Sequence, residues 1–359
     1  VRIKYSTSPN AAAVQWLSPE QTAGGKTPFL FTQSQAILAR TWIPLQDSPG
    51  VRFTYSASIT CPPDLMAVMS AENDTVLHAD GKYNFNMPQA IPSYLMALAV
   101  GNFKFHAYDN RSGVFAEPVT LDKAANEFID LPKMIAAAEE LYGPYAWGRY
   151  DVLVLPPSFP FGGMENPRIT FATPTIIAGD RSLVALVAHE LAHSWSGNLV
   201  TNATWNDFWL NEGFTVYFET RIMEKIYGKD YADMLTLLSL GELKETIASM
   251  GDTSRDTHLY LDLAGRDPDE GVSDIAYEKG RFFLTAIERA VGRPKWDAFV
   301  NSYFSKHAFH SMDTKTFLEY LDKELIKGDD SLRKNLQIDA WVYGPGLPTN
   351  CPEITSIEL

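Results

Sequence analysis

The sequence predicts a two-domain α+β protein, in which a strand-rich first part is followed by a mostly helical second part. The chain has 359 residues, and domains average about 150 residues, so the length fits two domains. Hydrophobic residues make up 45% of the chain and charged residues 21%, a composition typical of globular proteins with sizeable cores. The hydrophobic pattern changes from a strand period to a helix period after about residue 120.

Residues 1–116 are predicted to form an antiparallel sheet domain. The segment "VRFTYSASI" (51–59) alternates in the way of a half-buried strand. Residues 93–108 form a more apolar run that Gly101 interrupts. Turn signals such as "DSPG" and "CPPD" separate these segments, and proline and glycine recur throughout, which favours an antiparallel sheet.

Residues 117–346 are predicted to form the helical domain, and 347–359 a linker that leaves it. The first helix covers 121–143, where Gly143 ends it, and a buried strand follows at 150–157. The next helix spans 179–198, with Asp180 as its N-cap and Gly197 as its break. Further helices are expected within 205–228 and near 230–248, 274–291, 294–306 and 313–325.

The composition argues against several classes of partner. A net charge of −14 disfavours nucleic acid and anionic membranes. It suits peptides with a free, protonated amino terminus, and solubility alone would explain it equally well. No run approaches the roughly 18 apolar residues of a membrane helix, so no membrane insertion is expected. The sequence contains no secretory signal, so we expect a cytoplasmic protein. The chain starts without methionine in what reads as a strand, which indicates that its native N-terminus is missing, so a secreted or periplasmic protein is the second possibility.

The segment "AHELAHSWSGN" (188–198) carries the arrangement H-E-x-x-H. Residues four apart lie on one helix face, so His189 and His193 can bind one metal ion. Glu190 lies close to that face and can take a proton from a metal-activated water. The same letters would also fit a core helix with two buried histidines and a surface glutamate.

A catalytic zinc ion needs a third protein ligand and an open fourth position. Glu212 in "WLNEG" follows His193 by 19 residues, and a second helix packed antiparallel to the first would bring it to the ion. Two histidines and one glutamate form a known catalytic set, so the sequence predicts one Zn²⁺. Glu219, seven residues further on, is predicted to hydrogen-bond a ligand histidine or to be a surface charge.

These motifs, with "FGGMENP" (161–167) and "AYEKG" (276–280), resemble the gluzincin aminopeptidases of peptidase family M1. The branch that the chain resembles is that of leukotriene A(4) hydrolase and aminopeptidase B, through "LPPSFPFGGMENP", "GNLVTNATWNDFWLNEG", "WVYGPGLP", "TQSQA" (32–36) and "QDSPGVRFTY". The resemblance implies a saddle-shaped β domain, present in part, and a thermolysin-like catalytic domain. It also implies that a helical C-terminal domain of the full-length protein is absent from this chain.

The resemblance also implies roles for individual residues. Glu165 would bind the protonated α-amine of a peptide, with Gln35 assisting, and Tyr277 would hydrogen-bond the oxyanion opposite the zinc. Gly162 and Gly163 lack side chains, so a substrate backbone can pair there as an added strand. Further substrate contacts are assigned to Ala36, Met164 and Asn166. Without the resemblance, "FGGMENP" would be a tight turn and Tyr277 a packing residue.

The predicted function is removal of single residues from the amino end of peptides, with Glu190 as general base. A bifunctional enzyme would also hydrolyse a lipid epoxide, using the same zinc, an aspartate matched by Asp269 and a tyrosine whose position holds Val272. Asp269 could instead line the pocket for the first residue of the substrate. The chain could also be an inactive fragment that serves as a binding scaffold, or an endopeptidase, which Glu165 disfavours.

Overall fold

The computed structural model describes residues 1–357, which form two compact units. The first unit comprises Val1–Pro132 and Ala146–Leu191, and the second comprises Lys133–Tyr145 and the chain from Ala192 onward. In the described part of the chain, no helix is both long and apolar enough to cross a membrane.

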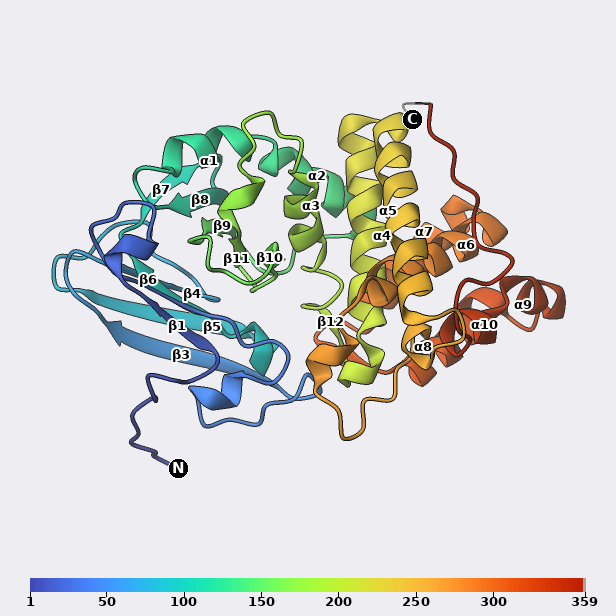
Figure 1. Ribbon diagram of the computed structural model, residues 1–359, viewed down its shortest axis with the longest axis horizontal. Coiled ribbons are helices and arrows are strands. Elements are labelled where there is room, and N and C mark those ends of the chain that lie inside the picture. Colours follow the sequence, from blue (N-terminus) through green and yellow to red (C-terminus); the bar gives the residue numbers. More distant parts are fainter. Residues whose placement is uncertain (358–359) are drawn as a thin grey trace. The chain divides into compact units, whose positions relative to one another are not determined.

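The first unit begins with antiparallel strands, as the sequence predicts (Figure 1). Its longest pair joins β3 (Arg52–Thr60) to β5 (Lys82–Pro92), and inward and outward residues alternate along β5 because successive side chains of a strand point to opposite faces. A four-stranded antiparallel sheet has the order β1 (Val14–Leu17), β2 (Phe29–Thr32), β6 (Leu98–Gly101) and β4 (Met66–Met69).

A five-stranded mixed sheet completes the first unit. Its order is β10 (Gly163–Met164), β11 (Ile169–Ala172), β9 (Tyr150–Val154), β8 (Ser112–Ala116) and β7 (Lys104–Ala107). The pairs β8–β9 and β9–β11 are parallel, which requires long connections, and the chain between β8 and β9 contains two helices. Strands β7 and β8 therefore belong to a sheet that continues beyond the domain boundary predicted at residue 116.

The second unit is built mainly of helices. In Figure 1, α4 (Trp209–Tyr227) and α5 (Lys229–Met250) lie side by side, joined at Gly228, whose φ of 94° lets the chain reverse. Its other main helices and strands are most of α2 (Leu131–Tyr142), the parallel pair β12 (Val200–Asn202) and β13 (His310–Met312), the π-turn η8 (Ile275–Lys279), α6 (Gly280–Val291), α7 (Arg293–Lys306), α8 (Thr314–Leu321), the π-turn η9 (Asp322–Ile326), α9 (Asp330–Leu336) and α10 (Ile338–Val342).

An aromatic core fixes α4 within the second unit. Phe214 is fully buried and stacks on Tyr303 with ring centroids 5.7 Å apart. Phe317 and Phe304 meet the same ring edge-on, at 5.5 and 5.4 Å. Such ring pairs add specific geometry to a large buried apolar area. The first turns of α4 are therefore held rigidly by their packing.

The predicted helix 121–143 is two helices, α1 (Leu121–Glu127) and α2. Pro132 lies at the start of α2, where its missing N–H costs nothing, whereas in the middle of one long helix its ring would clash with the preceding turn. Helices α9 and α10 lie where the sequence predicted no helix.

The predicted helix 179–198 is also shorter, because α3 covers only Ala185–Ala192. Gly179 and Arg181 have positive φ angles of 92° and 63°, and their N–H groups donate to the buried Glu127 carboxylate at 2.9 Å each. The prediction of Asp180 as the N-cap was wrong, since its carboxylate accepts from the Ser182 N–H and closes a turn before the helix.

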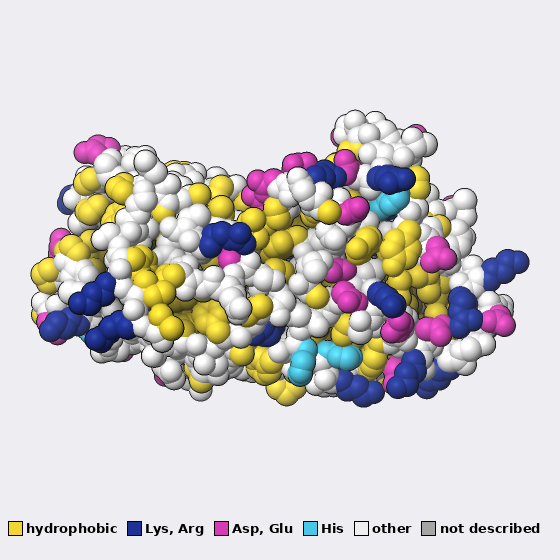
Figure 2. Space-filling view, turned by 90° about the horizontal axis from the view of Figure 1, so that it is seen from below, with side chains coloured by type: hydrophobic (Ala, Val, Ile, Leu, Met, Phe, Trp, Pro, Cys, Tyr) yellow, Lys and Arg dark blue, Asp and Glu magenta, His cyan; other side chains and the backbone are white. Residues whose placement is uncertain are grey.

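Acidic and basic side chains are intermixed on the helical unit's face seen in Figure 2, at the right of the view. The charge of −14 therefore does not gather there as one acidic patch. Several charges of the helical unit are paired, as in the contact of Arg293 with Glu224 at 2.7 Å, and exposed pairs of this kind contribute little to stability.

We expect Glu127→Ala to lower the free energy of unfolding by about 1.5–3 kcal/mol, because it removes a buried charged acceptor from two N–H groups. Thermal unfolding followed by circular dichroism measures the loss. Glu140→Ala is the control, since Glu140 is exposed in its ion pair with Lys225 and should change stability by less than about 1 kcal/mol. Equal effects of the two changes would contradict this interpretation.

Candidate metal centre

Three predicted ligands come together in the structure. The ligand atoms of His189, His193 and Glu212 lie within 4.8 Å of one another. His189 lies in α3, His193 follows its last residue, and Glu212 lies in the first turn of α4. The spacing of four residues therefore brings His189 and His193 together even though α3 ends one residue before His193.

The donor set fits a zinc ion. Ligands about 2.0–2.2 Å from a tetrahedral zinc lie roughly 3.3–3.6 Å apart. His193 Nε2 and Glu212 Oε2 are 3.4 Å apart, and both side chains are almost completely buried. Two imidazoles and one carboxylate leave the fourth position for water or substrate, which is the composition of a catalytic rather than a structural site.

Contacts to its other nitrogen orient the ring of His193. The Ser196 carbonyl lies 2.8 Å from Nδ1, and a carbonyl can only accept, so Nδ1 carries the proton and Nε2 is left to bind metal. The Thr215 hydroxyl lies 3.0 Å from the same nitrogen and donates to the Ser196 carbonyl at 3.1 Å. Sequence reasoning missed both residues, although Thr215 follows Glu212 by one helical turn and could have been considered.

Ser196 also ties the turn after α3 to the start of α4. Its hydroxyl lies 3.0 Å from the Leu210 carbonyl and 2.8 Å from the Asn211 carbonyl. The Asn211 side chain accepts from the Asn202 N–H at 2.8 Å, which adds β12 to the same cluster. Ser196 thus positions His193 directly and Glu212 through the backbone that precedes it.

A second group of possible ligands shares His193 with the first. Atoms of Glu165, Glu190 and His193 lie within 4.8 Å of one another, and all three residues are buried. Glu165 follows β10, the edge strand of the five-stranded sheet. Gly163 lies in β10 against Glu190, because a Cβ atom there would be 2.2 Å from Glu190 Oε1. Only glycine allows this approach.

Tyr277 lies in the π-turn η8, next to the helix that carries Glu212. Its ring meets Phe208 edge-on at 5.8 Å, and Phe208 directly precedes α4. Gly280 and Gly213 bring the two backbones into contact, since a Cβ on Gly213 would lie 2.8 Å from the Gly280 Cα. Gly213 follows Glu212, so this contact sets the register between Tyr277 and the ligand.

The structure gives the positions of the other predicted site residues but does not bear on their roles. Gln35 and Ala36 are buried, and the peptide bond between them is cis. Met164 and Asn166 are buried beside Glu165, and Gly162 accepts from the Thr173 N–H at 2.8 Å. Asp269 is exposed on the turn η7 (Pro268–Gly271), and Glu219 is half-buried in α4. The roles predicted for these residues stay predictions.

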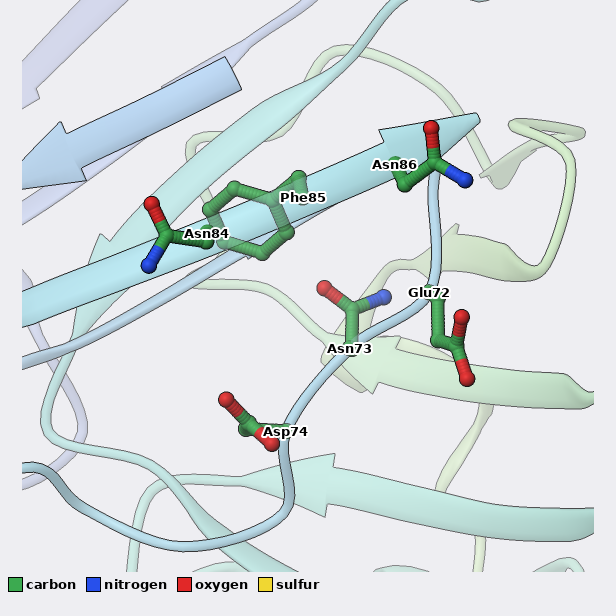
Figure 3. A pocket seen from close by; sticks show the side chains of 6 residues that line it. All are labelled: Glu72, Asn73, Asp74, Asn84, Phe85 and Asn86. Atoms are coloured by element: carbon green, nitrogen blue, oxygen red, sulfur yellow. The ribbon is translucent and has the colours of Figure 1, made fainter. Parts of the chain in front are cut away.

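The pocket in Figure 3 is polar and belongs to the β-sheet part of the first unit. It measures about 300 Å³ and is lined by Glu72, Asn73, Asp74, Asn84, Phe85 and Asn86. Asn73 closes a local turn through bonds of 2.8 Å to the N–H and carbonyl of Met69. Within residues 1–357, the acidic side chains of this pocket form no metal-ligand group, so we assign no function to it.

Comparison with known proteins shows two family matches. Residues 124–341 match the peptidase family M1 domain, and residues 1–95 match the peptidase M1 N-terminal domain. Leukotriene A-4 hydrolase of Xenopus laevis is 43% identical over 98% of this chain and 59% of its own length. Leucine aminopeptidase 2 of Yarrowia lipolytica is 44% identical over 97% of this chain and 55% of its own length.

Solved structures agree with the fold. The yeast LTA4 hydrolase in complex with bestatin is 41% identical, with a TM-score of 0.91 over 97% of this chain and 55% of its own. An M1 zinc metallopeptidase from Deinococcus radiodurans is only 22% identical but has a TM-score of 0.73. These similarities confirm the predicted fold class. The chain spans a little over half the length of the curated relatives described above.

We expect Glu212→Gln to lose zinc, whereas Glu190→Gln and Glu165→Gln keep about one ion per chain, because the His₂Glu group suits zinc better than the group with two glutamates. Metal analysis after dialysis against a weak chelator measures the difference. Retention of zinc by Glu212→Gln together with its loss from Glu190→Gln would place the metal in the second group instead.

Proposed function

The chain belongs to peptidase family M1, and from that premise we propose that it forms the zinc-dependent catalytic part of an aminopeptidase that removes single residues from the amino end of peptides. The family and the donor set confirm the predicted zinc cofactor. The observation that carries the proposal is the pair of ligand groups that share His193, one suited to a metal and one to a proton and an amine.

Glu190 is the general base in this proposal. It lies one residue from His189 on α3 and is buried beside Gly163, so its carboxylate faces a site from which bulk water is largely excluded. It takes a proton from the attacking water and later delivers that proton to the leaving amine. When bound, the zinc ion supplies polarisation of the scissile carbonyl and acidification of water.

Tyr277 is the proposed hydrogen-bond donor to the developing oxyanion. Its hydroxyl would favour the transition state because charge on the oxygen increases as the tetrahedral intermediate forms. The packing of its ring on Phe208 and the contact of Gly213 with Gly280 support a fixed position for this donor.

Glu165 is the proposed partner of the substrate's α-ammonium group. It is 5% exposed, and a buried carboxylate near a metal site gains most from a positively charged partner. The outer edge of β10 lies beside it, and a peptide could add there as a further strand, through Gly162 and Gly163. Fixing the amine beside the metal would limit cleavage to the first peptide bond.

We expect the full-length protein to hydrolyse aminoacyl chromogenic substrates and Glu190→Gln to reduce kcat by at least about 10²-fold with zinc retained. A substrate panel with parallel zinc analysis tests this and ranks the preferred first residue. Zinc-loaded wild-type protein that cleaves none of the substrates would instead favour the binding scaffold.

A matched pair of glycine substitutions tests the position of Glu190. Gly163→Ala should lower kcat by about 10–10²-fold, because its Cβ would lie 2.2 Å from the Glu190 carboxylate and force it to move. Gly241→Ala is the control, since Gly241 lies in α5, outside the proposed site, and a Cβ there would meet no atom within 4 Å beyond its own helix. Similar kcat values for the two variants would mean that the carboxylate position is not critical.

Glu165→Ala should reduce kcat/KM for substrates with a free amine by about 10²-fold or more, which corresponds to about 3 kcal/mol of lost transition-state stabilisation. Glu165→Gln keeps the shape but loses the charge and should be nearly as impaired. The preference for free over N-acetylated substrates, measured as a ratio of kcat/KM, should fall in both variants. An unchanged ratio would refute the assignment to Glu165.

Epoxide hydrolysis is a second candidate, favoured by the 43% identity to a protein named leukotriene A-4 hydrolase. Asp269 is exposed on η7, and Val272, at the position expected for a tyrosine, is 40% exposed and offers no hydroxyl. Incubation with a lipid epoxide, with Asp269→Asn as the comparison, distinguishes this activity from peptide cleavage.

A further inference from the structure

Lys279 is a buried lysine that the proposed mechanism does not use. It is the last residue of η8, two positions after Tyr277, and its relative exposure is 0%. Its ammonium donates to the carbonyls of Thr257 at 2.7 Å and Gly344 at 2.8 Å. No carboxylate among the described residues pairs with it, which is unusual because buried lysines normally have an acidic partner.

The two carbonyls belong to segments that are distant in sequence. Thr257 ends the turn η6 (Arg255–Thr257), and Gly344 follows α10. The Thr257 hydroxyl joins the same segments again, since it donates to the Ser254 carbonyl at 2.6 Å and accepts from the Gly346 N–H at 2.9 Å. We call Lys279, Thr257, Gly344 and Gly346 the lysine knot. It connects η8 to two loops through backbone groups.

The π-turn needs such support. A π-turn contains one more residue than an α-helical turn and is uncommon because its hydrogen bonds are less favourable. Relaxation to α-helical spacing would move its residues by one position, or about 100° around the axis. Contact of Gly280 with Gly213 holds the turn against α4, and the lysine knot holds its last residue.

We propose that Lys279 is a positioning residue for Tyr277: its buried ammonium, bonded to two backbone carbonyls, keeps η8 in the π-turn that presents the tyrosine hydroxyl to the metal centre. This inference rests on the proposed function, because the role of Tyr277 is part of that function. It also assigns a purpose to the segment around Gly344, whose carbonyl is one of the two anchors.

The choice of lysine at this position has an energetic cost. Burial lowers the pKa of Lys279 to about 7, so the fold disfavours the charged amine even though two carbonyls accept from it. His258 follows Thr257, and burial, with Lys279 as the next cause, lowers its pKa as well. A methionine would fill the same volume without this cost. A buried amine that opposes stability is explained if its bonds specify one backbone geometry.

A double-mutant cycle tests the proposal in the full-length protein. We expect Lys279→Met to lower kcat by about 10–10²-fold while KM and zinc content change by less than about twofold. Tyr277→Phe should lower kcat by about 10²–10³-fold. Because Lys279 acts through Tyr277, adding Lys279→Met to Tyr277→Phe should lower kcat by less than about threefold more.

Asn301→Ala is the matched control for a purely structural effect. Its side chain likewise joins two backbone carbonyls, those of Leu141 at 2.9 Å and Asp297 at 3.0 Å, but it lies in α7 and makes neither bond to η8. This variant should lose thermal stability and keep the wild-type kcat. A wild-type kcat in Asn301→Ala would show that a general loss of stability does not lower kcat, so that the lower kcat of Lys279→Met comes from the lost bonds of Lys279.

Three results would overturn the proposal or its premise, and they are distinguishable. Multiplicative losses in the double variant, or an unchanged kcat in Lys279→Met, would overturn the role of Lys279. An unchanged kcat in Tyr277→Phe would instead overturn the proposed role of Tyr277. If Lys279→Met does not fold, Thr257→Val replaces it in the test, because this change removes only the hydroxyl that bonds to Ser254 and Gly346. Thr257→Val should lower kcat by a few-fold in the protein with Tyr277 and leave kcat unchanged in the Tyr277→Phe variant.

Discussion

The metal centre depends on the hydrogen bonds of one residue, Ser196. Its carbonyl fixes the imidazole of His193, and its hydroxyl bonds to the backbone one and two residues before Glu212. Two ligands that are 19 residues apart in sequence are therefore oriented by a single turn. Because these groups are buried, each lost bond would leave a polar atom without its partner, which makes the arrangement stiff.

Close backbone approach is the second constraint on this fold. Gly163 allows the edge strand β10 to lie against Glu190, and Gly213 allows η8 to lie against α4. A methyl group on Gly163 would occupy the space of the proposed base, Glu190, and one on Gly213 would collide with the backbone of Gly280. Glycine is normally unfavourable in a helix interior, by about 1 kcal/mol relative to alanine, so Gly213 exchanges some stability of α4 for this contact.

Two buried cationic side chains of the second unit have different kinds of partner. Arg221 is paired with Asp297 at 2.9 Å, as expected for a charge that stabilises a fold. The ammonium of Lys279 has only carbonyl partners among the described residues, and burial lowers its pKa. The first arrangement connects α4 to α7 through a pair of opposite charges. The second is explained better by the geometry it imposes on η8. Features that oppose local stability are found most often near functional sites.

The sequence by itself determined the cofactor of this protein and the group of residues that come together as a possible site for it. The spacing of His189, Glu190 and His193, with Glu212 further on, predicted the metal and its ligands, because one helix period and one donor set suffice for that inference. Hydrophobic periods located most helices and the main strands.

Tertiary structure alone decided where α3 starts, because bonds to a distant carboxylate, Glu127, hold Gly179 and Arg181 at positive φ angles that a helix does not contain. It alone revealed Ser196 and the lysine knot, since those contacts join residues whose spacing follows no helix or strand period.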